Sequence, residues 1–66
     1  PPRRWCWNRY IELARETTGL ELKSMRGHAV SFTKGLPSAK KIRNIMHGKT
    51  SKEEFAAATS NFLASN

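Results

Sequence analysis

Apolar residues recur at three- and four-residue spacing along most of this 66-residue chain, which is the pattern of amphipathic helices. The first such stretch predicts a helix over residues 3–18. Gly19 follows it, at the position where a left-handed residue commonly ends a helix. The inner stripe of this predicted helix consists of Cys6, Trp7, Tyr10, Leu13, Ala14 and Thr17, widened by Ile11.

A second helix is predicted over residues 20–30, although Gly27 lowers its helix propensity by about 1 kcal/mol relative to alanine. Its inner side is formed by Leu22, Met25 and Ala29. Residues 31–37 contain Gly35 and Pro37 and little helical pattern, so they are predicted to form a loop. The residues expected to anchor this loop to the core are Val30, Phe32 and Leu36.

The C-terminal half carries clearer helix boundaries. Ser38 can cap a third helix that Gly48 ends, with an inner face of Ala39, Ile42, Ile45 and Met46. Ser51 and Glu54 have the spacing of a capping box before a fourth helix. The buried side of that helix is expected to contain Phe55, Ala58, Thr59, Phe62 and Leu63. No pair of strands is indicated, so we expect one all-α domain, a compact bundle of about four short helices.

The charges are unevenly distributed. Twelve Lys and Arg residues face five Asp and Glu residues, for a net charge of +7. All five acids lie outside residues 22–52, where a soluble surface would usually mix the two signs. The basic residues within that stretch are Lys23, Arg26, Lys34, Lys40, Lys41, Arg43, Lys49 and Lys52. A block of one sign spanning two helices is typical of a surface that binds phosphates.

The predicted third helix would present polar side chains outward. With its apolar face inside, Lys40, Arg43, Asn44 and His47 face solvent, and Lys41 lies on the flank. Arginine can bind guanine and asparagine can bind adenine, each through two hydrogen bonds, while lysine supplies charge for phosphates. Ser38 and the free amides at the helix start can bind a phosphate directly. The alternative is an ordinary solvated face of an amphipathic helix.

The spacing of Ile42, Ile45, Gly48 and Lys49 resembles the end of the recognition helix and the following turn in lambda-repressor-like helix-turn-helix domains. That resemblance covers residues 42–50 and implies a helix-turn-helix-like fold in which helix 38–47 enters the major groove. It further implies that Lys40, Arg43, Asn44 and His47 face bases or phosphates and that Lys49 faces a phosphate. The predicted loop before this helix is longer than the turn of that family.

Catalysis and metal binding find little support. Cys6, His28 and His47 are far apart in the sequence and show no zinc-ligand spacing, and the scattered glycines form no phosphate-binding loop. A Cys-His nucleophile pair stays an alternative, although Cys6 lies on an apolar stripe. We therefore expect no enzymatic activity, no cofactor and no metal.

The sequence predicts a non-enzymatic, intracellular nucleic-acid-binding domain, most simply one for duplex DNA, excised from a larger protein. RNA binding is the alternative, for which Trp5 and Phe32 are the candidate stacking residues. A membrane-active basic peptide and a protein-interaction module with an acidic partner are further alternatives. Small modules of this kind often act in pairs, so a second copy or the parent protein is a further candidate partner. The predicted contact residues are Lys23, Arg26, Lys34, Ser38, Lys40, Lys41, Arg43, Asn44, His47 and Lys49.

Overall fold

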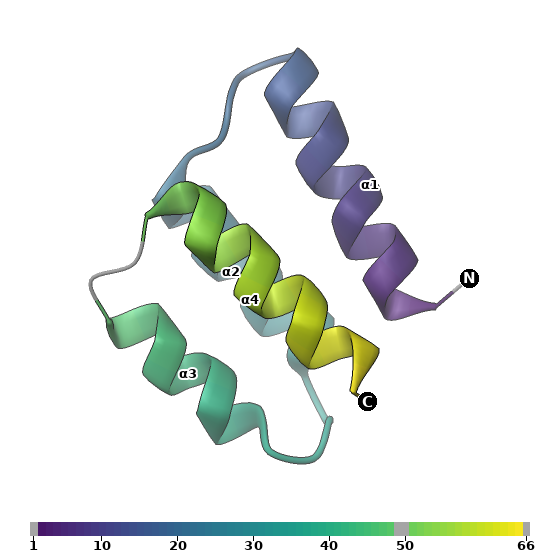
Figure 1. Ribbon diagram of the computed structural model, residues 1–66, viewed down its shortest axis with the longest axis vertical. Coiled ribbons are helices and arrows are strands. Elements are labelled where there is room, and N and C mark those ends of the chain that lie inside the picture. Colours follow the sequence, from purple (N-terminus) through teal and green to yellow (C-terminus); the bar gives the residue numbers. More distant parts are fainter. Residues whose placement is uncertain (1, 49–50, 66) are drawn as a thin grey trace.

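The part of the chain that the structure describes forms four helices. The computed structural model describes residues 2–48 and 51–65, and these contain α1 (Arg3–Glu16), α2 (Leu22–Thr33), α3 (Ala39–His47) and α4 (Lys52–Ala64). The described residues include no strand, which confirms the predicted all-α bundle. Helix α4 packs against each of the other three helices. In Figure 1, α1 and α3 lie on opposite sides of α4, and α2 lies behind it.

Helix α1 ends at Glu16, two residues before its predicted end. Gly19 has a positive φ of 83°, and its amide donates a hydrogen bond to the carbonyl oxygen of Ala14 at 2.6 Å, so the predicted role of this glycine in ending the helix is confirmed. The predicted inner stripe is too wide. Leu13 is 43% exposed and Thr17 is also exposed, because the helices packed against α1 do not cover all seven residues of the stripe.

Helix α2 runs to Thr33, so the prediction of a loop beginning at residue 31 was wrong for its first three residues. Phe32 packs edge-on against Trp7, with ring centroids 5.6 Å apart. The hydroxyl of Thr33 donates to the carbonyl oxygen of Ala29 at 2.7 Å. These contacts favour a further helical turn beyond the predicted end of the helix. Val30, predicted to anchor the core, is instead 50% exposed.

Residues 34–38 connect α2 to α3. Gly35 has a φ of 80°, which a residue with a side chain adopts only with strain. Leu36 packs against the core, as predicted. Ser38 directly precedes α3. Its φ of 62° lies outside the extended region that an N-cap usually occupies. Its backbone carbonyl accepts a hydrogen bond from the Lys41 amide. The predicted side-chain cap therefore lacks its usual geometry.

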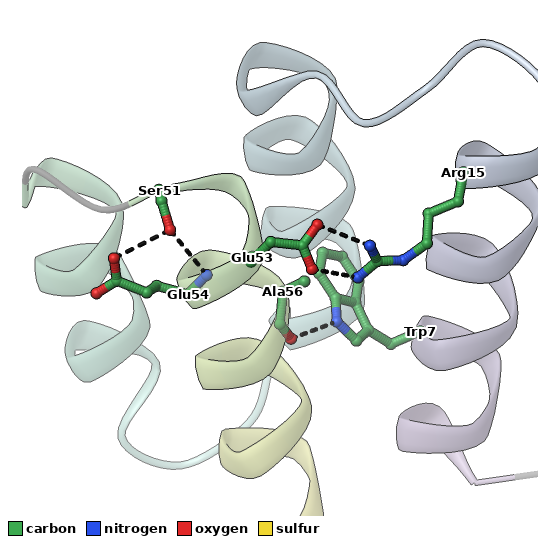
Figure 2. A network of polar contacts seen from close by, with 6 residues as sticks. All are labelled: Trp7, Arg15, Ser51, Glu53, Glu54 and Ala56. Carbon is green, nitrogen blue, oxygen red and sulfur yellow. Dashed lines mark hydrogen bonds and ion pairs between the residues drawn. The ribbon is translucent and has the colours of Figure 1, made fainter.

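Helices α3 and α4 follow their predicted patterns closely. Ile42 is fully buried, whereas the side chains of Ile45 and Met46, also predicted to lie inside, are outside the described part of the structure. At the start of α4 the Ser51 hydroxyl accepts a hydrogen bond from the Glu54 amide at 3.2 Å and donates one to its carboxylate at 3.0 Å (Figure 2). The prediction that Ser51 caps α4 together with Glu54 is therefore confirmed.

The core lies between α4 and the other helices. The Trp7 side chain is fully buried, and its indole Nε1 donates to the carbonyl oxygen of Ala56 at 3.1 Å (Figure 2). Ala56 was not predicted to be inside, because it lies beside the stripe rather than on it. The buried hydrophobic residues of this cluster are Trp7, Ile11, Leu20, Met25, Ala29, Phe55, Ala56 and Leu63.

Candidate nucleic-acid interface

Most charged side chains of α1 and α4 form hydrogen bonds or ion pairs with other groups of the protein. Arg15 of α1 forms a two-pronged ion pair with Glu53 of α4, with nitrogen–oxygen distances of 2.7 and 2.6 Å (Figure 2). Arg9 pairs with Glu12 on the surface of α1 at 2.9 Å. The hydrogen bonds from Arg15 lower the pKa of the Glu53 carboxyl, and the same bonds raise the pKa of Arg15.

The two arginines at the start of α1 are also engaged. Arg3 donates from Nη1 to the carbonyl oxygens of Phe32 and Lys34, each at 3.1 Å, and so caps the end of α2. Arg4 donates from Nε to the Ser60 hydroxyl at 3.4 Å. All four arginines of α1 therefore have a contact within the fold.

The cations of α2, α3 and their connection are arranged differently. All of them are exposed, and none forms an ion pair with a carboxylate in the described part of the chain: Lys23, Arg26, Lys34, Lys40, Lys41 and Arg43. We call this set the unpaired cations. Since no acid offsets them, their positive field is available to an external anion.

The other predicted contact residues can be placed as well. Ser38, Asn44 and His47 are exposed, Asn44 and His47 on α3 and Ser38 directly before it. Lys49 lies outside the described residues. Because Ile42 is buried and Ala39 half-buried, the outward face of α3 carries the polar side chains that the periodicity predicted.

A groove between α2 and α3 brings two of the unpaired cations together. It has a volume of about 340 Å³ and includes Lys34 from the end of α2 and Arg43 from the middle of α3. Val30 and Ser31 of α2 also line it. The half-exposed Val30 adds an apolar surface to the same groove, which suits the sugar of a nucleotide or the methyl group of thymine.

Val30 and Ser31 were missed as interface residues because α2 was expected to end at Val30. The spacing of Met25, Ala29 and Thr33 continues the helical period by four residues at each step, and this signal would have extended the helix.

A second, shallower depression lies on the outer face of α2. Its volume is about 390 Å³, and it is lined by Lys23, Ser24, Gly27, His28 and Ser31. His28 stacks on Tyr10 of α1 with ring centroids 4.2 Å apart, and its Nδ1 lies 2.8 Å from the carbonyl oxygen of Ser24. Ser31 lines both hollows, so the polar outer face of α2 continues into the groove beside α3.

The nearest acid to this surface in the sequence is Glu21, directly before α2. Burial raises the pKa of the Tyr10 phenol, and the negative charge of Glu21 raises it further. The negative charge of Glu21 thus acts on Tyr10 of α1. Within the described residues, no ion pair links Glu21 to a cation of α2 or α3.

Cys6 and His28 are among the residues considered for other chemistry. Cys6 is half-buried on α1, and His28 is held by its stack on Tyr10. Within residues 2–48 and 51–65, no three His, Cys, Asp or Glu side chains gather as a metal site requires. Among the described helices, none combines the length and apolar character needed to cross a bilayer.

Comparison with known proteins identifies no relative: no protein-family model, no curated protein and no solved structure matches this chain.

Proposed function

We propose that this chain is a non-enzymatic DNA-binding domain that receives duplex DNA on the surface formed by α2, α3 and their connection. One observation carries the proposal. Six of the nine described Lys and Arg residues that form no ion pair lie on these elements, whereas both described ion pairs involve α1 or α4. The other three are Arg3, Arg4 and Lys52. Phosphate binding by lysine and arginine is strongest where the protein itself does not neutralise them.

The geometry of α2 and α3 supports a helix-turn-helix arrangement. Their connection is five residues long, from Lys34 to Ser38, and contains Gly35 in a left-handed conformation. Helix-turn-helix motifs use a similarly short turn that often contains glycine. Because α2 extends to Thr33, this connection is closer in length to such a turn than the seven-residue loop expected from the pattern. In this proposal α3 is the recognition helix, and Arg43 and Asn44 read base edges.

The exposed aromatic residues favour duplex DNA over single-stranded RNA. Single-stranded RNA is usually bound by aromatic rings on which bases stack. Trp5 and Phe32 are the two candidate stacking residues. Phe32 is half-buried against Trp7, whereas Trp5 is 58% exposed. Trp5 belongs to α1, so it is separate in the sequence from the unpaired cations.

The proposal is tested by measuring the affinity of the protein for labelled DNA duplexes of several sequences, and for single-stranded RNA, at increasing salt. If all six unpaired cations contact phosphates, the logarithm of the affinity for duplex DNA should fall with the logarithm of salt with a slope of about −5. Tighter binding of the RNA than of every duplex would contradict the proposal.

Arg43→Gln and Arg9→Gln form a matched pair, since each removes one exposed positive charge. Arg43 lines the groove beside α3, whereas Arg9 is paired with Glu12 on α1. We expect Arg43→Gln to weaken binding by about 1–3 kcal/mol, unequally across sequences, and Arg9→Gln to have little effect. Equal losses in the two variants would mean that net charge alone attracts DNA.

A further inference from the structure

A hollow at one end of the bundle borders the proposed DNA surface, with which it shares Leu36 of the connection between α2 and α3. It has a volume of about 470 Å³ and is lined by Pro2, Arg3, Arg4, Leu36, Leu63 and Ala64. We call it the end cup. The start of α1, the connection between α2 and α3, and the end of α4 contribute to it, and Figure 1 shows the start of α1 and the end of α4 on the same side of the molecule.

The floor of the end cup is apolar. Leu63 is buried and Leu36 is half-buried, and both belong to or pack against the hydrophobic core. Pro2 and Ala64 add exposed apolar surface at the rim. An occupant of this floor gains most if it brings an aliphatic group.

Arg3 and Arg4 line the end cup, and each has N–H donors that form no hydrogen bond within the described residues. The bonds from Arg3 Nη1 leave its Nε and Nη2 groups, and the bond from Arg4 Nε leaves both of its terminal nitrogens. Neither forms an ion pair with a carboxylate of the described chain. Because Arg3 is tied to the end of α2, its guanidinium is held in place before any ligand arrives.

The positive charges at the start of α1 favour a ligand with negative charge. Arg3 and Arg4 occupy the first helical turn, where the helix dipole is positive, and this turn contains no acidic residue. Pro2, the N-cap, makes no side-chain cap bond. Negative groups on a ligand would offset this local excess of positive charge.

We propose that the end cup binds an acidic peptide segment that carries one aliphatic side chain. The aliphatic group rests on Leu36 and Leu63, and carboxylates on either side of it accept hydrogen bonds from Arg3 and Arg4. An acidic peptide supplies both groups from one short segment, an aliphatic side chain for the leucines and carboxylates for the arginines. This inference does not depend on the proposed binding of DNA.

The test uses a fluorescein-labelled peptide, Gly-Ser-Glu-Glu-Leu-Glu-Glu-Ser-Gly, titrated with the protein and followed by anisotropy. We expect saturable binding that weakens about tenfold when the peptide leucine is replaced by alanine. Arg4→Gln should also weaken binding about tenfold, since it removes a charged hydrogen-bond donor. Arg9→Gln is the matched control on the same helix and should leave the affinity unchanged.

Ala64→Glu provides a second, independent variant. This exposed position at the rim would place a carboxylate of the protein beside the arginines, and we expect it to abolish peptide binding while the helices persist in circular dichroism. The proposal is overturned if the peptide does not bind saturably, if its alanine variant binds equally well, or if Arg4→Gln and Arg9→Gln weaken binding to the same extent.

Discussion

The hydroxyl of Thr59 allows a sharp test of how the core is assembled. Thr59 lies on α4 and is fully buried, and its Oγ1 has no hydrogen-bond partner among the described residues. A buried hydroxyl without a partner costs about 1–3 kcal/mol. Thr59→Val replaces it with a methyl group of nearly the same shape and leaves helix propensity almost unchanged. We therefore expect the variant to be more stable by about 1–2 kcal/mol.

The measurement is urea unfolding of both proteins followed by circular dichroism, together with thermal melting. For a domain of this size the melting temperature should rise by about 4–8 °C for each kcal/mol gained. The urea midpoint should rise with no change in the slope of the transition, since the same surface is exposed on unfolding.

Thr33→Val is the matched control. Thr33 is also buried in a helix, but its hydroxyl donates to the carbonyl oxygen of Ala29 at 2.7 Å. The lost bond, about 0.5–1.5 kcal/mol, and the gained methyl burial should nearly cancel. If Thr59→Val lowered the midpoint, the Thr59 hydroxyl would have a partner in solution, and the reasoning would be refuted.

Three further predictions concern stability. Gly27→Ala should stabilise α2 by about 1 kcal/mol, measured by thermal melting, because an added Cβ meets nothing within 4 Å and the glycine has no positive φ; a destabilised variant would contradict this. Ser51→Ala should cost about 1 kcal/mol by removing the cap of α4, whereas Ser65→Ala, at the other end of the same helix, should cost less. The pKa of Glu53 is lower in the folded protein than its ordinary 4.5, so its contribution to stability is complete above that pH and is lost as the pH falls through the folded value. Glu53→Gln should flatten the acid side of a plot of stability against pH, and an unchanged profile would mean that the ion pair with Arg15 does not persist in solution.

The features that were predictable from the sequence are mostly local. Gly19 ends α1 and Ser51 caps α4 because each acts on backbone groups within a few residues of itself. The buried position of Ile42 follows from the helical period alone. On this basis the number of helices and the outward face of α3 could be read from the sequence.

The features that were not predictable depend on contacts between distant residues. One of them is the packing of Phe32 against Trp7, which lies 25 positions earlier in the chain. In the same way, the use of Arg3 and Arg15 within the fold depends on partners 29 or more positions away. The groove beside α3 joins Val30 to Arg43 across the connection. A periodicity in the sequence carries no information about such pairs.

The place of α4 in the bundle has a consequence for how the protein is made. As α4 follows α1, α2 and α3 in the chain yet packs against each of them, a nascent polypeptide still lacking residues 52–64 has no shared partner for its earlier helices. In such a chain the Trp7 indole lacks the Ala56 carbonyl to which it donates a hydrogen bond in the folded protein. Stable packing of α1, α2 and α3 in the nascent chain therefore requires that residues 52–64 have been made.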